Sequence, residues 1–276
     1  MRLVLAAVSV MLAQTQSTRT DEKQTAAVEA AVKTIEERAA PEISRLGAQH
    51  AWAGVYYAGD GTGMNVRLAL APAAGFAYGW HGCMGSYDRN YGTVEDNGRQ
   101  LHLVPKLANA KDGIHLETEL VPIAWGPRRY LIAAPKLKDF CNGVNAGREP
   151  RTQPHGLFLL RLDDEKKGVN GRPRSPAGAL DCILDKPIRT RIVSVGASRT
   201  KLDDKYEALT TSVRLGAGRV DGVWEGMTFA YEALGPLSSI RVVEVSEHSS
   251  QAEIKDWGEK GTTKPPAVGV AVTTKR

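Results

Sequence analysis

Residues 52–105 read WAGVYYAGDGTGMNVRLALAPAAGFAYGWHGCMGSYDRNYGTVEDNGRQLHLVP, and this stretch decides the fold. Short runs in which apolar residues alternate with other residues are separated by the turn-like segments GDGTG, PAAG and DNG. Alternation with a period of two between glycine-rich turns is typical of antiparallel strands joined as a meander. The stretch therefore predicts a β-barrel or sandwich, and it gathers glycine, aromatic and polar residues at the turns.

Strand-like runs continue on both sides of residue 189, where a second unit is expected to begin. From there to the end, short apolar runs are separated by GAG, DG, EHSS and TTKPP, a spacing that suits a small closed barrel. The predicted fold is all-β with one N-terminal helix. A β-meander barrel or sandwich at residues 51–188 is followed by a small C-terminal β-barrel at residues 189–276.

The N-terminus carries a pattern typical of a secretory signal. Arg2 precedes residues 3–13, which are apolar apart from Ser9. A membrane-spanning helix needs about 20 apolar residues, so this run is too short to span and fits a signal peptide. We expect residues 1–17 to be removed by cleavage after Ser17, leaving a mature chain without a transmembrane segment. The expected location is periplasmic or secreted.

Residues 18–50 predict an amphipathic helical segment. Apolar residues recur at helical spacing, Asp21 and Gln24 can form a capping box at the start, and Pro41 is expected to stop the helix. The apolar positions are Val28, Ala31, Val32 and Ile35. One weak stripe cannot build a bundle, so the helix is expected to pack on the barrel or to act as a stalk.

Three cysteines allow one disulfide and leave one thiol over. We expect a bond between Cys83 and Cys141, because both lie in turn sequence rich in glycine and asparagine, and this bond suits an exported protein. The spacing of the cysteines matches no zinc motif, and the six histidines form no metal-binding pair. We therefore expect neither a metal nor a cofactor.

The net charge of +5 and the pI of about 9.1 describe a mild basic excess that is spread along the chain. Diffuse basicity permits contact with anionic polymers without requiring it. No nucleic-acid-binding motif accompanies it, so we expect no nucleic-acid partner. A cell-envelope protein, glycan or lipid remains as a partner, and the oligomeric state stays open.

The densest polar cluster lies within residues 80–91. A thiol, an imidazole and a carboxylate at Cys83, His81 and Asp88 invite a hydrolase hypothesis. Catalytic groups normally converge from separate segments, so a structural interpretation, with a packed or paired cysteine and side-chain turns, is preferred. Ligand-binding candidates on these strands are Tyr57, Phe76, Trp80, His81, Asp88, Arg89, Asn90 and Tyr91.

The segment GDGTGMN at residues 59–65 superficially resembles a calcium or phosphate loop. It lacks the acidic ligand series of an EF-hand and the Lys-Ser/Thr of a nucleotide-binding loop. A hairpin connection explains its glycines more simply. We therefore expect a turn at this position.

Several motifs resemble known families. W-x-G-x-Y, NVRLAL, FAYGW, YGTV, DNG and LHLVP resemble the lipocalin-like and META-type meander barrels of exported bacterial proteins. GDGTGMNV, GWHGCMGSYDRNYG and DFCNGVNAGREPR are similar to an uncharacterised family of bacterial secreted β-proteins, which implies no activity. The segment GRVDGVWEGM at residues 218–227 is similar to a turn in the small C-terminal β-barrel of flagellar assembly protein T. That resemblance implies positive φ at its glycines, with Val223 and Met227 filling the barrel.

The leading hypothesis is an exported, non-catalytic, envelope-associated binding or assembly-interaction protein. A filled barrel with an exposed apolar patch would favour it. A lipocalin-like carrier of a small apolar or glycan ligand would instead need a cavity lined by Tyr57, Phe76 and Trp80. The hydrolase alternative, with His81, Cys83 and Asp88, would need a histidine to converge on Cys83 or Ser86.

Overall fold

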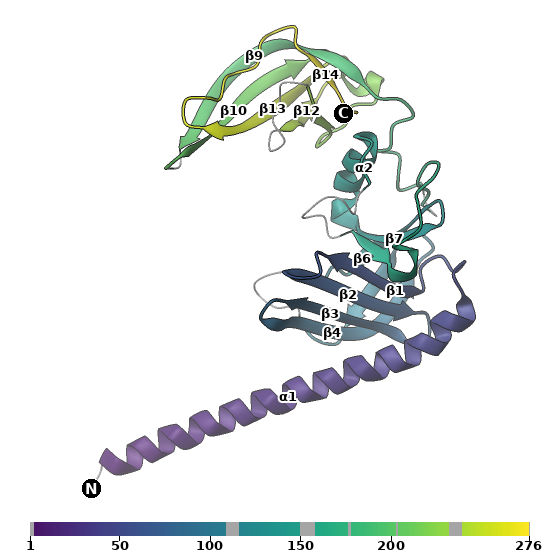
Figure 1. Ribbon diagram of the computed structural model, residues 1–276, viewed down its shortest axis with the longest axis vertical. Coiled ribbons are helices and arrows are strands. Elements are labelled where there is room, and N and C mark those ends of the chain that lie inside the picture. Colours follow the sequence, from purple (N-terminus) through teal and green to yellow (C-terminus); the bar gives the residue numbers. More distant parts are fainter. Residues whose placement is uncertain are drawn as a thin grey trace. The chain divides into compact units, whose positions relative to one another are not determined.

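The computed structural model describes residues 3–108, 116–149, 158–175, 178–202, 204–231 and 239–275, with side chains from residue 25 onward except at residue 239 (Figure 1). The predicted all-β fold with an N-terminal helix is confirmed. The chain forms two compact units, residues 1–134 with 154–177 and residues 135–153 with 178–276. This division places residues 135–153 and 178–188 with the second unit, whereas we expected them in the first.

The first unit contains a closed eight-stranded antiparallel barrel. Each strand pairs with the next along the chain, and β1 also pairs with β8, which closes the barrel as a meander. The strands are β1 (Gly54–Gly59), β2 (Met64–Ala71), β3 (Gly75–Gly82), β4 (Gly85–Asp96), β5 (Leu101–Pro105), β6 (Glu119–Trp125), β7 (Arg128–Ala133) and β8 (Leu159–Arg161). Closure leaves this sheet without a free edge.

Large apolar side chains fill the interior of this barrel. An eight-stranded barrel is just wide enough for side chains to fill it. The fully buried members of this core are Tyr56, Leu68, Leu70, Phe76, Leu101, Leu103 and Leu131. Burial of one such side chain contributes about 2 kcal/mol, so this cluster is the main source of stability in the first unit.

Helix α1 (Leu3–Leu46) packs on the outer face of β2, β3 and β4. Small side chains allow the close approach, since Ala39 packs against Ala71 and Ala74. The carboxylate of Glu42 accepts hydrogen bonds from the backbone N–H groups of Ala73 and Ala74, both at 2.9 Å. None of the helices in the described part of the chain has the length and apolarity that a membrane crossing requires.

Two expectations about this helix are wrong. Asp21 does not begin it, because the helical backbone already includes residues 3–20, and Pro41 does not stop it, because the helix continues to Leu46. Proline removes a single hydrogen bond from the helix. Beyond Pro41, the bonds of Glu42 and the packing of Ile43 and Leu46 hold the last turn on the barrel.

The second unit is a six-stranded antiparallel sheet in the order β11-β12-β13-β10-β9-β14. Among the residues that the structure describes, one bridge between Ala230 and Thr273 joins the two outer strands, with hydrogen bonds of 2.8 and 2.9 Å, and makes a nearly closed barrel. The strands are β9 (Arg189–Leu202), β10 (Tyr206–Leu215), β11 (Thr228–Phe229), β12 (Ser239–Val245), β13 (Ser250–Glu259) and β14 (Ala271–Thr273). Helix α2 (Leu137–Asn145) belongs to this unit.

Most of the expected features of the GRVDGVWEGM turn are present, but Gly218 is extended, with a φ of −137°. Gly222 and Gly226 have φ values of +85° and +94°, which favour glycine, and Val223 and Met227 are buried in the second core. This core also contains Ile192, Val213, Leu215, Phe229, Ile240, Val242, Ala252 and Ile254. Short 3₁₀ turns lie at Ala134–Lys136, Leu162–Asp164 and Arg219–Asp221.

Candidate functional site: the β3–β4 hairpin

The hairpin between β3 and β4 carries most of the residues that the sequence singled out. Trp80 pairs with Asp88 and His81 pairs with Ser86, so Tyr87 is the extra residue of a β-bulge. The bulge brings the Tyr87 ring onto Trp80, with 4.8 Å between the ring centroids. A Cβ at Gly82 would lie 2.3 Å from the Tyr87 ring, so this aromatic pair requires glycine at that position.

Polar groups lie inside the barrel beneath this aromatic pair. Tyr78 pairs across the strands with Asn90, and both residues are buried. Burial, followed by the negative charges of Asp88 and Glu117, raises the pKa of the Tyr78 hydroxyl, which therefore stays neutral and keeps its proton. Among the described residues, the Tyr78 hydroxyl and Trp80 Nε1 have no hydrogen-bond partner. Two hydrogen-bond donors are thus unused at this end of the barrel.

Asn90 has a structural role at the same place. Its Nδ2 donates to the carbonyl of Leu107 at 2.9 Å, and its Oδ1 accepts from the N–H of Leu107 at 3.2 Å. These bonds fasten the chain that follows β5 (Leu101–Pro105) to β4, and they occupy the side-chain amide. Asn90 is therefore held within the fold, whereas Tyr78 and Trp80 keep free donors.

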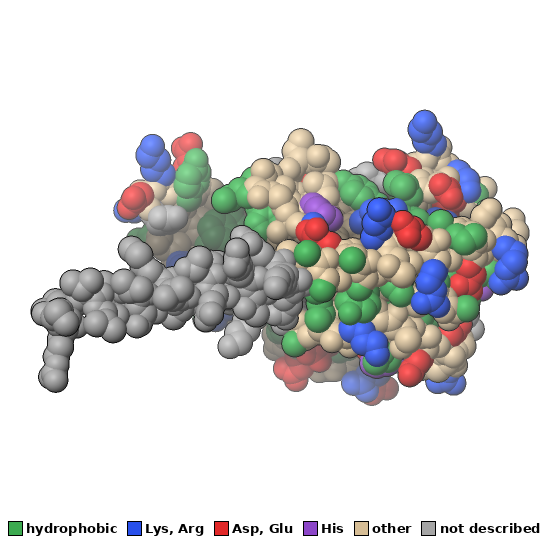
Figure 2. All heavy atoms as spheres, turned by 90° about the horizontal axis from the view of Figure 1, so that it is seen from below, with side chains coloured by type: hydrophobic (Ala, Val, Ile, Leu, Met, Phe, Trp, Pro, Cys, Tyr) green, Lys and Arg blue, Asp and Glu red, His purple; other side chains and the backbone are tan. Residues whose placement is uncertain are grey.

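The outer side of the hairpin meets helix α1. Arg89 forms an ion pair with Glu29, and Arg67 forms another with Glu36. A hollow of about 640 Å³ lies between the helix and β4, lined by Thr25, Val28, Glu29, Ser86, Tyr87, Asp88 and Arg89. Lys and Arg side chains are interspersed with Asp and Glu on the face shown in Figure 2. Arg89 thus links β4 to the helix through its ion pair with Glu29.

The hydrolase candidates are not brought together. His81 Cε1 lies 2.9 Å from the point where a Cβ at Gly79 would stand, so the ring turns back along β3 and away from the tip. Asp88 is on the inward face opposite Trp80, and Cys83 is free and exposed at the tip. A nucleophile needs its base within hydrogen-bond reach, and this arrangement does not supply one.

The candidates for a ligand cavity lie on two different faces. Phe76 is fully buried in the filled interior, and Trp80 packs against the same cluster. Tyr57 points outward, where its hydroxyl meets Asn65 Oδ1, and Tyr56 takes the inward position instead. Contrary to our expectation, Tyr57 therefore does not point into the barrel. With two adjacent tyrosines, the sequence alone does not show which of them faces inward. Tyr91 lies on β4 and is half-buried.

The expected disulfide between Cys83 and Cys141 is wrong. Cys141 bonds to Cys182, with 5.8 Å between their Cα atoms, and Cys83 is the free cysteine. The first unit holds Cys83 on a hairpin tip, whereas α2 places Cys141 beside residue 182 within the second unit. Residue composition near a cysteine cannot reveal this, because pairing depends on tertiary proximity.

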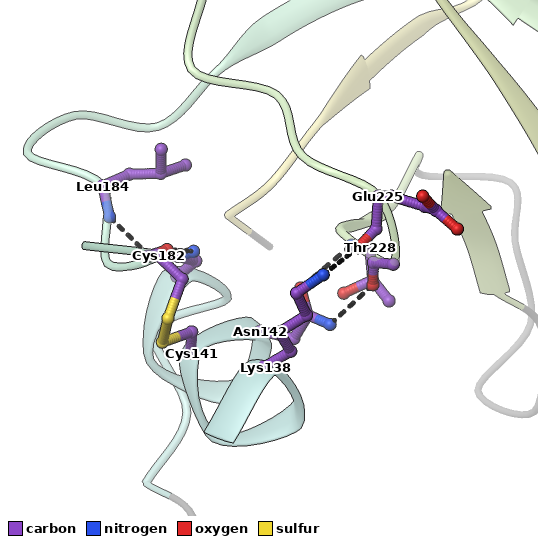
Figure 3. The surroundings of a disulfide bond; sticks show 9 residues. Lys138, Cys141, Asn142, Cys182, Leu184, Glu225 and Thr228 are labelled. Carbon is purple, nitrogen blue, oxygen red and sulfur yellow. Dashed lines mark hydrogen bonds between the residues drawn. A yellow bond between two sulfur atoms is a disulfide. The ribbon is translucent and has the colours of Figure 1, made fainter. Parts of the chain in front are cut away.

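Two asparagines of α2 bind backbone groups outside the helix in the same way (Figure 3). Asn142 Nδ2 donates to the carbonyl of Gly226 and its Oδ1 accepts from the N–H of Thr228, both at 3.0 Å. Asn145 repeats the pattern on the carbonyl of Cys182 and the N–H of Leu184, both at 2.9 Å. Each amide thus satisfies one backbone carbonyl and one backbone N–H group. We call these residues, with the disulfide, the α2 clamp.

The α2 clamp gives the residues of the DFCNGVN motif a structural role. Asn142 and Asn145 are three residues apart and share one side of a helix, which is the signal that sequence reasoning missed. The Lys138 ammonium adds a bond of 3.0 Å to the carbonyl of Glu225. The motif therefore anchors the turn before β11 (Thr228–Phe229).

Buried Arg161 forms a second unpredicted anchor, in the first unit. Its guanidinium donates to the carbonyls of Ala48 and His50, both at 2.8 Å, and lies 5.7 Å from the centre of the Tyr56 ring. His50 Nδ1 accepts from the N–H of Ala53 at 2.9 Å. Burial and the Arg161 charge lower the pKa of His50, so its ring is held neutral. These bonds fix the chain between α1 (Leu3–Leu46) and β1 (Gly54–Gly59).

The GDGTG segment is a hairpin turn, as expected. Asp60 Oδ1 accepts from the N–H groups of Thr62, Gly63 and Met64 at 2.9, 2.7 and 3.1 Å. These bonds lower the pKa of Asp60 to about 2. The carboxylate is occupied by its own turn, and within the described ranges no group of three or more His, Cys, Asp and Glu side chains could hold a metal ion.

Comparison of the chain with known proteins gave no relative. No protein-family model matches it, and neither the curated proteins nor the solved structures contain a significant match.

Proposed function

We propose that this protein is a non-catalytic binding or assembly-interaction protein of the cell envelope that acts in the periplasm or outside the cell. The observation that supports this proposal is a filled barrel carrying an exposed apolar hairpin tip. Met84 is 87% exposed and Tyr87 is 43% exposed, whereas the side chains beneath them are closely packed. Methionine and tyrosine are enriched at protein interfaces, where they supply contact area.

The hairpin is held in a defined position before any partner arrives. The Tyr87 ring stacks on Trp80, and Arg89 is paired with Glu29 of α1 (Leu3–Leu46). A pre-ordered surface loses less conformational entropy when it binds, which favours affinity.

The disulfide supports a location outside the cytoplasm. Structural disulfides persist in oxidising compartments and are rare where thiols are kept reduced. The bond between Cys141 and Cys182 anchors α2, which is a structural role. The two cysteines are separated by 41 residues and do not form a C-x-x-C redox motif. Trapping of free thiols in intact cells is expected to label Cys83 alone. Labelling of all three cysteines would contradict this location.

The function can be tested by capture from a cell-envelope extract, with bound proteins, lipids and glycans identified together. We expect the double variant Met84→Ser/Tyr87→Ser to retain about one tenth of the captured partner, since two central apolar contacts are worth over 1.4 kcal/mol. The matched control is Val243→Ser, which alters another exposed apolar residue, 45% accessible, in the second sheet. Equal capture by the double variant and the control would contradict the role of the hairpin tip.

Two further measurements address the other functions. A hydrolase would lose turnover of an ester or peptide substrate on Cys83→Ser, and we expect that variant to behave as the parent protein. A carrier would release a stoichiometric small molecule in native mass spectrometry. We expect none, because fully buried Phe76 and its neighbours occupy the barrel interior.

A further inference from the structure

The outer edge of β9 (Arg189–Leu202) is open over most of its length. On one side β9 pairs with β10 as far as Leu202, but on the other side β14 pairs only with Arg189–Arg191. The last hydrogen bonds on that side join Ile192 to Val270 and Gly269, at 3.0 and 2.8 Å. Within the described ranges, no strand pairs with residues 193–202 on this edge.

The open edge is also accessible to solvent. Every residue from 196 to 202 is exposed, whichever face of the sheet it occupies. Figure 1 shows β9 at the margin of the sheet. An edge strand of this length presents unpaired N–H and C=O groups, which is the arrangement that receives an added strand from another chain.

The charge of β9 indicates what kind of strand it receives. The strand carries four cations, Arg189, Arg191, Arg199 and Lys201, and no acidic residue. Arg199 forms an ion pair of 3.0 Å with Glu253, but both side chains are largely exposed, so the pair is weak and can exchange. Opposite charges on neighbouring strands stabilise their pairing.

We propose that residues 193–202 of β9 bind an extended acidic segment of a partner protein as an additional strand. Main-chain hydrogen bonds supply the binding, and Arg199 and Lys201 select acidic side chains on the incoming strand. A second copy of β9 is disfavoured, because its own Arg199 and Lys201 would bring like charges onto the joined sheet. This proposal rests on the proposed function only in that the protein acts by binding a partner.

The test uses the full chain and two synthetic peptides of about ten residues, the length of the open edge, one alternating Glu with Thr and one alternating Lys with Thr. We expect the Glu-containing peptide to bind more tightly than the Lys-containing peptide. Hydrogen exchange measured by NMR is expected to slow at alternate amides of residues 193–202, because only every second N–H of β9 faces the open edge.

The matched variants change charge without changing strand pairing. Arg199→Glu/Lys201→Glu is expected to weaken binding of the Glu-containing peptide about tenfold, the effect of two cross-strand pairs. Arg214→Glu, on the inner strand β10 (Tyr206–Leu215), is the control and should leave binding unchanged. Circular dichroism of each variant checks that the sheet is intact.

Three results would overturn the proposal. They are equal affinity for the two peptides, protection outside β9, and a peptide-independent dimer that protects residues 193–202. The hairpin double variant Met84→Ser/Tyr87→Ser separates this proposal from the proposed function. If capture from envelope extract depends on the hairpin while neither peptide binds β9, the strand-addition proposal fails and the proposed function stands.

Discussion

The first barrel closes completely, whereas the second barrel closes through one bridge and leaves a long strand edge open. In the first barrel, β1 (Gly54–Gly59) pairs with β8 (Leu159–Arg161), and a continuous apolar core fills the inside. In the second, the bridge between Ala230 and Thr273 is supplemented by the α2 clamp, which fixes the turn before β11 with side-chain amides. Polar contacts and a covalent bond thus replace the strand pairing that the second barrel lacks.

This difference shows that two similar barrels in one chain can offer different kinds of contact surface. A closed barrel has no backbone groups left to offer, so its contact surface must be made of side chains, as at the hairpin tip. A partly closed barrel can offer backbone as well, as β9 (Arg189–Leu202) does. We therefore expect the stability of the second barrel to depend on the α2 clamp.

Removal of the disulfide is expected to have the largest effect. The double variant Cys141→Ala/Cys182→Ala opens a loop of 41 residues. Loss of that constraint on the unfolded chain should lower the free energy of unfolding of the second unit by about 4 kcal/mol. Calorimetry should show its transition shifted while that of the first unit stays in place. An unchanged second transition would show that the clamp does not hold this barrel.

The asparagine contacts of the clamp are expected to come next. Asn142→Ala removes two hydrogen bonds, to Gly226 and Thr228, and should cost about 2 kcal/mol in urea unfolding of the second unit. Lys138→Ala on the same helix removes one exposed bond and should cost less than about 0.5 kcal/mol. Equal costs for the two variants would contradict the role of the side-chain amide.

In the first unit, His50 is expected to give a smaller, pH-dependent effect. Its pKa is lowered in the folded state, chiefly by burial and then by Arg161, so protonation opposes folding. The stabilisation is therefore fully present above pH 6.5 and is lost as the pH falls through the lowered pKa. His50→Ala should cost about 1 kcal/mol at pH 7.5 and flatten the pH dependence of unfolding.

The matched control for this titration is His102→Ala, which alters a more exposed histidine beside Glu119 on the same barrel. This variant should leave unchanged the loss of stability that His50 causes as the pH falls below 6.5. If both variants remove the pH dependence equally, the anchor around Arg161 is not its source.

The smallest effect on stability is expected at Cys83. This thiol is free and exposed at the hairpin tip, so Cys83→Ser should change the unfolding midpoint very little. Under mild oxidation, however, the parent protein should form a reducible dimer, because the remaining thiol of an oxidised protein tends to pair between molecules. Non-reducing electrophoresis should show the dimer in the parent and its absence in the variant. A dimer in Cys83→Ser would point to exchange at the α2 disulfide.

Local patterns predicted much of the fold, because strand alternation and turn residues act over short distances. Residues 52–105 formed the meander, and two of the three glycines of the GRVDGVWEGM turn, Gly222 and Gly226, adopted positive φ. The expectation that Pro41 ends the helix was wrong, because the contacts of Glu42 with the barrel outweigh the tendency of proline to end a helix. The expectation for Tyr57 was wrong because, with two adjacent aromatic residues, alternation does not tell which one faces the core.

The candidate site was located by sequence but not resolved by it. Composition drew attention to residues 80–91, yet only the bulge at Tyr87 decides that two rings stack while His81 turns away from Cys83. Pairing of Cys141 with Cys182 and the twin contacts of Asn142 and Asn145 also required the helix in place.

The sequence by itself determined the class of fold and the positions of its turns, since alternation and glycine placement are local properties. The tertiary structure decided which edges close, which cysteines meet and which donors stay unused. These outcomes depend on residues far apart in the chain, and their distances are set only when the sheets form. The open edge of β9 (Arg189–Leu202) is such an outcome, because β14 (Ala271–Thr273) covers only its first residues.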